Sequence, residues 1–224
     1  MRNYFAEVLL VYKLMEAIGL LFVGWLFGIA SPLFVEFVQK PIRRSSIKQS
    51  LQIEFRRLRF QLTHSAKLVG AGRGLLTSEI FGNFHRMQKE DRSPLYGESI
   101  HEDGDDLLSA KDLDLDSFLR IAINNPRMFM LKKQSVPFLT SNLAQLQLFS
   151  PDYQRRSLEV AADLTSINDA IDDVARCLEK TFDTTLNEVN RKSVLTNQES
   201  AYRTYFNGVC KVADNIDELL KMKK

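Results

Sequence analysis

The chain has 224 residues, of which 30 are lysine or arginine and 28 are aspartate or glutamate. The small net charge of +2 argues against a general affinity for nucleic acid, although the charge is unevenly spread: residues 1–92 carry +7, residues 93–120 carry −6 and residues 121–224 carry +1. The two cysteines, Cys177 and Cys210, lie far apart and match no disulfide framework, redox motif or metal-ligand spacing, so a reducing compartment is expected.

Residues 17–35 read AIGLLFVGWLFGIASPLFV, and none of these nineteen side chains is ionisable. A helix of that length is about 28 Å long, close to the hydrocarbon thickness of a bilayer. A core helix would carry a polar face, and a cleaved signal peptide would have a basic leader and a shorter apolar stretch. The sequence therefore predicts a retained transmembrane helix over residues 17–38.

The basic residues that follow the span predict its orientation. Positive charges beside a span are retained in the cytoplasm, so we expect the N-terminus outside an inner or plasma membrane and the large C-terminal part inside. Residues 1–16 either lie in the outer interface or lengthen the span into a tilted helix. The basic residues nearest the span also attract anionic lipid headgroups, at about 1 kcal/mol each. These predicted headgroup contacts are Lys40, Arg43, Arg44 and Lys48.

Small residues recur on one side of the predicted span, at Ala17, Gly24, Gly28 and Ser31. Small side chains let two helix backbones approach closely, which favours association of spans in lipid. Glycine is also common in spans for other reasons, so both interpretations stay open. The functional one predicts a homo-oligomer held through these four residues.

After the span, every long segment has the periodicity of a helix, so the predicted fold class is all-α. Residues 39–92 are expected to form basic juxtamembrane helices, with one helix ending at the glycines of GAGRG (70–74). Residues 93–116 combine acidic residues with glycine and proline and are expected to form an acidic loop. Residues 117–224 are expected to form a helical bundle.

Within that bundle a helix is expected over about 136–149, and a longer one begins at Ser150, a good N-cap before Pro151 and Asp152. This helix and the last one carry apolar residues at heptad spacing. Such seams favour either a hairpin within the chain or pairing between subunits, and the hairpin is preferred because each seam is shorter than four heptads. The seam residues are Val160, Leu164, Ile167, Ile171, Val174 and Leu178 in one helix, and Tyr202, Phe206, Val209, Ala213, Ile216 and Leu220 in the other.

The acidic loop contains HEDGDD (101–106), which lacks the order of acids and glycine that a calcium loop requires. The three histidines have no metal-ligand spacing, so no metal and no cofactor are predicted. A solvated loop that contacts the basic membrane-proximal helix of its own or a neighbouring subunit is the simpler interpretation.

One catalytic pattern is present. The stretch RFQLTH places Arg59 and His64 with four residues between them, and it resembles the R-x4-6-H motif of HEPN ribonucleases. The resemblance implies that Arg59 binds the scissile phosphate and that His64 assists transfer of the 2′-hydroxyl proton, roles that suit a guanidinium and an imidazole. The structural alternative is a basic helix with one histidine on its polar face.

The layout of one span, a cytoplasmic helical domain and this motif resembles the HEPN-like membrane-pore accessory proteins of type VI CRISPR systems. The resemblance implies an oligomeric ring and a role in bacterial antiviral defence. We therefore expect a membrane-anchored scaffold or pore-forming effector rather than an enzyme, with the bilayer, further copies of the chain and a protein partner as its contacts. The alternatives are an anchored HEPN-like ribonuclease, and a sensor whose basic region binds an anionic ligand or nucleic acid.

Overall fold

A computed structural model describes the backbone of residues 2–96, 131–183, 185 and 187–222. The side chains of residues 2–14, 26, 29–38 and 93–96 lie outside this description. Over the described ranges the regular secondary structure is helical and contains no strand, which confirms the all-α prediction. The chain divides into two units, Met1–Lys48 and Gln49–Lys224.

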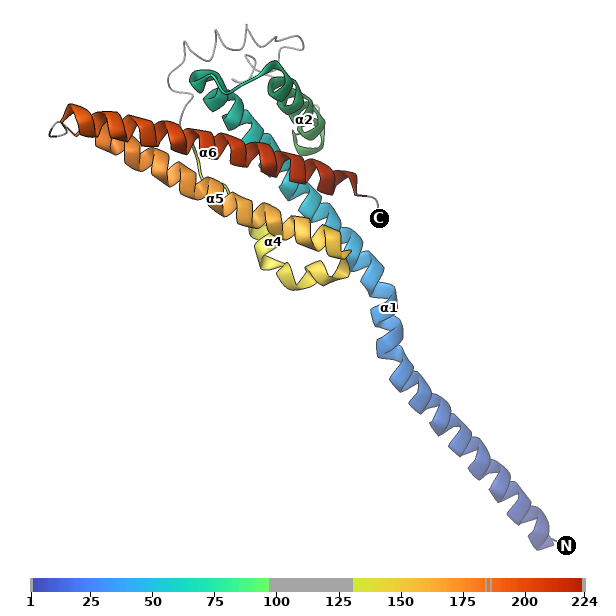
Figure 1. The fold of residues 1–224 in the computed structure, drawn as a ribbon. Helices are drawn as coiled ribbons and strands as arrows, with labels where there is room; N and C mark the ends of the chain where they lie inside the picture. The colour runs from blue at the N-terminus through green and yellow to red at the C-terminus, as the bar shows by residue number, and fades with distance from the viewer. Residues whose placement is uncertain (1, 97–130, 184, 186, 223–224) are drawn as a thin grey trace. The chain divides into compact units, whose positions relative to one another are not determined.

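Helix α1 runs from Arg2 to Arg73 and contributes to both units (Figure 1). Residues 2–16, the predicted span 17–38 and the following basic residues all belong to this one continuous helix. Its C-terminal half is amphipathic, as the sequence periodicity predicts. The buried apolar positions of that pattern are Ile47, Leu51, Phe55, Leu58, Leu62, Ala66 and Val69.

Helix α1 ends within the predicted glycine stretch. Gly74 has a φ of 65°, a left-handed conformation that glycine adopts without strain. The N–H groups of Leu75 and Leu76 donate to the carbonyl of Gly70 at 2.8 and 3.3 Å, which satisfies a terminal carbonyl of the helix. The chain then turns into α2.

Helix α2 covers Ser78–Tyr96 and buries Phe81, Phe84 and Met87. It begins after Thr77, whose side chain accepts a hydrogen bond from the N–H of Ile80 at 3.2 Å. Residues 93–96 were expected to belong to the acidic loop (93–116), but they are helical because α2 continues to Tyr96. The rest of that loop, residues 97–116, and the first part of the predicted bundle, residues 117–130, lie outside the described residues.

The helix predicted over 136–149 is divided into two short pieces, α4 (Pro137–Ser141) and the 3-10 helix η2 (Leu143–Leu148). Asn142 separates them, and its side-chain amide donates to the carbonyl of Phe138 at 2.8 Å. Glu54 of α1 accepts hydrogen bonds from the N–H groups of Phe138 and Leu139 at 2.7 and 2.9 Å. A carboxylate from α1 thus caps the positive end of α4.

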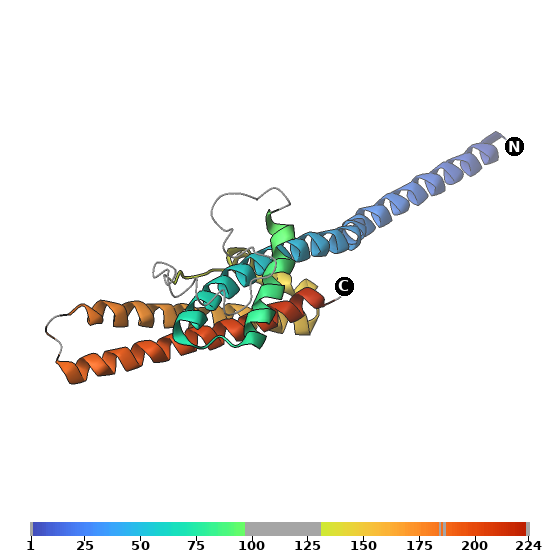
Figure 2. The same cartoon turned by 90° about the horizontal axis from the view of Figure 1, so that it is seen from above.

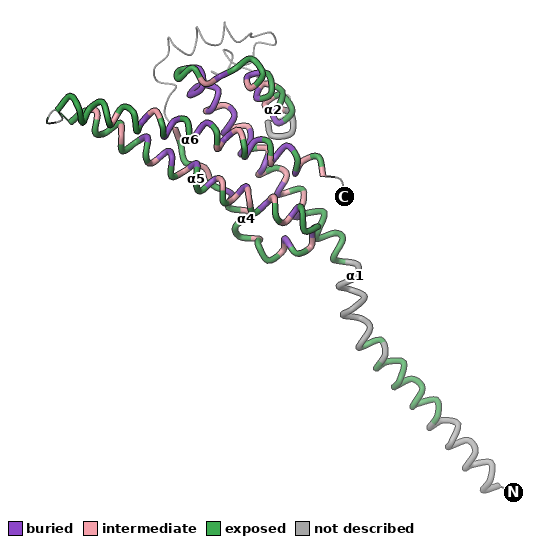
Figure 3. Tube along the Cα trace, viewed as in Figure 1, coloured by how far each residue is buried: buried purple, intermediate pink, exposed green. Residues whose placement is uncertain are grey.

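Helices α5 (Pro151–Thr181) and α6 (Glu188–Lys221) lie side by side and antiparallel, as Figures 1 and 2 show. Ser150 accepts from the N–H of Tyr153 at 3.4 Å, and Asn187 accepts from that of Asn190 at 2.8 Å, so a side chain caps each start. The heptad residues face one another within the chain, and Figure 3 shows buried positions along both helices. The predicted intrachain hairpin is present; only Leu178 and Leu220 of its seam are not buried.

Candidate functional site

Apolar side chains are exposed on every side of α1 between residues 15 and 28. Successive residues of a helix are rotated by about 100°, so a run of consecutive apolar residues covers the whole circumference. All described side chains in this stretch, at residues 15–25, 27 and 28, are exposed, and none after Glu16 is ionisable. A helix that is apolar all round is normally buried. The large exposed side chains are Met15, Ile18, Leu20, Leu21, Phe22, Val23, Trp25 and Phe27.

The predicted association face is open. Ala17, Gly24 and Gly28 are exposed, and a Cβ atom added at either glycine would meet nothing within 4 Å. Spacings of seven and four residues place these positions on one side of a continuous helix. The backbone of Ser31 belongs to the same helix, whereas its side chain lies outside the described ones. The face is available for contact, and self-association through it stays a prediction.

No helix among the described residues has a stretch that is both long and apolar enough to cross a bilayer. The predicted span, residues 17–38, includes eleven side chains that lie outside the described set, at positions 26 and 29–38.

The predicted headgroup contacts follow on the same helix. Lys40, Arg43 and Arg44 are exposed and Lys48 is half-buried. Lys40, Arg44 and Lys48 are spaced by four residues, so they share one side of the helix. That side presents positive charge beside the apolar stretch, an arrangement suited to anionic headgroups.

Arg59 is buried in a network of carboxylates, with only 1% of its surface exposed. Its Nε and Nη2 atoms donate to the two carboxylate oxygens of Asp91, both at 2.7 Å. Its Nη1 atom donates to Asp217 at 2.6 Å, and Glu90 accepts a longer bond of 3.3 Å from Nη2. The guanidinium therefore joins α1 to α2 and α6 through its fork of donors.

These contacts keep Arg59 charged. Burial lowers its pKa, but hydrogen bonds and charge interactions with Asp91 and Asp217 outweigh burial, and the net pKa lies above the ordinary value. Asp217 also accepts from Lys221 at 2.5 Å, and Arg56 donates to Asp91 at 3.2 Å. The network thus balances positive and negative groups, which buried charges require.

The arrangement of Arg59 and His64 gives no support to their catalytic hypothesis. Five positions on one continuous helix rotate their side chains about 140° apart, so they point in different directions from α1. Arg59 directs its donors at protein carboxylates, and His64 is half-buried. The geometry makes Arg59 a structural residue; ribonuclease activity itself stays a prediction.

Lys67 is a second buried cation that the sequence analysis missed. It is 2% exposed, and its Nζ atom lies 5.2 Å from the centroid of the Phe81 ring. Burial lowers its pKa to about 8. The sequence signal is visible in retrospect: Arg59, Thr63 and Lys67 recur every four residues and form a polar stripe within the buried face of α1.

Among the described residues no three histidine, cysteine, aspartate or glutamate side chains are grouped closely enough to hold a metal ion. The acidic residues of the predicted loop, from Glu98 to Asp116, lie outside those residues. The two cysteines are free thiols, and burial raises the pKa of Cys210 to about 11. A reactive thiolate at neutral pH is therefore not expected at Cys210.

Comparison with known proteins identifies no relative: no protein-family model, curated protein or solved structure matches this chain.

The Arg59 network predicts a large difference between two neighbouring acids. Asp91→Asn keeps the shape of the side chain but removes the charge that faces the buried guanidinium, so we expect the free energy of unfolding to fall by about 3 kcal/mol. Glu90→Gln is the matched control, because Glu90 is 43% exposed and should contribute less than about 1 kcal/mol. Denaturant unfolding of the full chain in detergent measures both, and equal losses would contradict the structural role of Arg59.

Lys67 predicts a pH-dependent stability. Between about pH 8 and 10.5 the unfolded chain still binds a proton that the folded amine has lost, so the free energy of unfolding should rise with pH, by up to about 3 kcal/mol. Lys67→Met removes this titration, and it should be more stable than the natural chain below pH 8. The difference should disappear as the pH approaches 10.5. A difference that is constant with pH would show that burial does not lower the pKa of Lys67.

Proposed function

We propose that the chain is a membrane-anchored, self-associating helical protein that acts as a scaffold or pore-forming effector rather than as an enzyme. The observation that carries this proposal is the apolar surface of α1 between Met15 and Phe27, which none of the described residues covers. Within it, Leu21 is 74% exposed and Phe27 is 72% exposed.

Exposure of this surface to water is unfavourable. Each Å² of apolar surface removed from water contributes about 25 cal/mol, and folded proteins rarely expose contiguous apolar patches above a few hundred Å². Protein partners usually cover one side of a helix, whereas lipid covers all sides. A helix that is apolar around its whole circumference, in a run of nineteen uncharged residues, therefore fits the interior of a bilayer best.

The basic residues give the proposed anchor a direction. Lys40, Arg43, Arg44 and Lys48 follow the apolar run, so the positive-inside tendency favours a cytoplasmic position for the C-terminal unit. The same residues would hold anionic headgroups at the inner surface. The membrane concerned is an inner or plasma membrane.

Self-association and a non-enzymatic role have separate support. The open face at Gly24 and Gly28 suits close helix–helix contact. Arg59, the residue on which a nuclease would depend, already binds Asp91 and Asp217. A pore and a part in antiviral defence stay predictions of the layout resemblance alone.

Membrane retention tests the anchor. The natural chain should stay in the membrane pellet after a carbonate wash, and Leu21→Arg with Phe22→Arg should release it, since each arginine disfavours insertion by about 2.5–3.5 kcal/mol. Ser45→Arg with Ser46→Arg adds the same charge at exposed positions of the same helix and should leave retention unchanged. Release of the natural chain by carbonate would overturn the proposal.

The small-residue face predicts which glycines matter for self-association. Gly24→Leu with Gly28→Leu should shift the detergent-solubilised protein toward monomer, because the added side chains keep two backbones apart. Gly19→Leu is the matched control: Gly19 is equally open but lies about 140° around the helix from Gly24. Mass measurement by light scattering reads the outcome, and an unchanged mass in the double variant would remove this face from the interface.

A further inference from the structure

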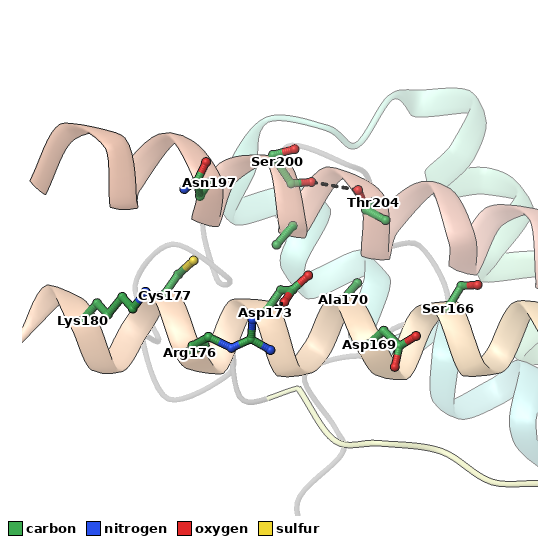
Figure 4. Close-up of a pocket in the computed structure, with 11 residues that line it drawn as sticks. Ser166, Asp169, Ala170, Asp173, Arg176, Cys177, Lys180, Asn197, Ser200 and Thr204 are labelled. Atoms are coloured by element: carbon green, nitrogen blue, oxygen red, sulfur yellow. Dashed lines mark hydrogen bonds and ion pairs between the residues drawn. The ribbon is translucent and has the colours of Figure 1, made fainter. Parts of the chain in front are cut away.

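A groove runs along the hairpin between α5 and α6, on the side shown in Figure 4. Its volume is about 500 Å³. Ala170 from α5 and Ala201 from α6 are buried at its floor, while Ser200 and Thr204 are short, exposed side chains along the α6 side. Small residues on two neighbouring helices leave room for a third helix to lie between them.

The charged residues of this groove all come from α5, and they are sorted by sign. Asp169 and Asp173 occupy the half nearer the start of α5, and Arg176 and Lys180 occupy the half nearer its end (Figure 4). All four are exposed. Spacings of four, three and four residues place them on one stripe of the helix.

The spacing of these four charges is symmetric about one point. Asp169 and Lys180 are equidistant from the midpoint between residues 174 and 175, and Asp173 and Arg176 are equidistant from the same midpoint. A two-fold rotation about an axis through that point therefore brings each acid of one helix opposite a base of the other. Self-complementarity of this kind is what an isologous dimer interface requires.

We propose that the groove is the docking surface for α5 of a second copy of this chain, with the two α5 helices antiparallel. Asp169 then faces Lys180 of the second copy and Asp173 faces its Arg176, while the alanine floor permits close approach. The stripe from Asp169 to Lys180 spans about 16 Å, three helical turns, which matches the length of a local helix–helix crossing. Within one chain Asp173 forms an ion pair with Arg176 at 3.3 Å. In the dimer, Asp173 of each chain would instead pair with Arg176 of the other chain.

This pairing rests on the proposed function, because it supplies a contact of the self-associating assembly outside the apolar segment of α1. It does not use Gly24 or Gly28, so the two contacts can be separated experimentally.

A zero-length carbodiimide crosslink tests the pairing on the full chain in detergent. The reagent joins a carboxylate to an amine only where they touch, and we expect an amide between Asp169 and Lys180 in the crosslinked dimer. Within one rigid helix these residues are about 16 Å apart along the axis, too far for direct contact, so the crosslink has to come from two chains. A crosslinked dimer without this amide would overturn the pairing.

Charge reversal provides the second test. Asp169→Lys with Asp173→Lys makes the stripe wholly basic, and because like charges then meet across the axis it should lower the dimer fraction about tenfold or more in the Gly24→Leu, Gly28→Leu background. Light scattering reads the dimer fraction here, because the reversal also removes the carboxylates that the crosslinker needs. Adding Arg176→Glu and Lys180→Glu restores two complementary halves in reversed order, so it should restore the dimer. Arg155→Glu with Glu159→Lys is the control, since it reverses an exposed ion pair of α5 outside the groove.

The outcomes distinguish the two proposals. Failure of the charge swap to restore a dimer, or no effect of the reversal in a protein that still self-associates, rejects the groove and leaves the proposed function standing. A natural chain that is monomeric in detergent rejects both the groove and the self-association.

Discussion

Contact between water and an apolar helix is the constraint on which the interpretation of this molecule depends. From Ala17 to Gly28, helix α1 presents apolar side chains or glycine around its circumference. The described part of the chain does not cover them. Exposure of such a surface to water is unfavourable. Lipid would cover the helix on every side, and this is the basis of the proposed membrane anchor.

The second unit is held by a different kind of interaction. The guanidinium of Arg59 joins α1 to Asp91 of α2 and to Asp217 of α6. The C-terminal half of α1 is thereby fixed among helices that it also meets through apolar contacts. The same helix thus supplies both the apolar segment and two buried cations of the bundle, Arg59 and Lys67. A residue that first suggests phosphate chemistry is better explained as the electrostatic centre of the bundle.

Periodicity predicts most of this fold, because local patterns determine where helices form and which side is buried. The heptad seams, the cap at Ser150 and the helix end near Gly74 follow from such patterns. The division of the predicted 136–149 helix at Asn142 does not follow from a local pattern. It depends on the hydrogen bond from the Asn142 side chain to the carbonyl of Phe138 and on the cap that Glu54 provides. Local patterns also do not predict the structural role of Arg59, because its partners Asp91 and Asp217 lie 32 and 158 positions away along the chain.

The environment of Trp25 most directly tests the claim that lipid surrounds the apolar segment of α1. Trp25 is the only tryptophan of the sequence and lies within the exposed apolar stretch, so tryptophan fluorescence reports on that stretch alone. In vesicles that contain the full chain, lipids brominated deep in their acyl chains should quench this fluorescence strongly, and aqueous iodide should not. Strong quenching by iodide with none by brominated lipid would place Trp25 in water and contradict the account.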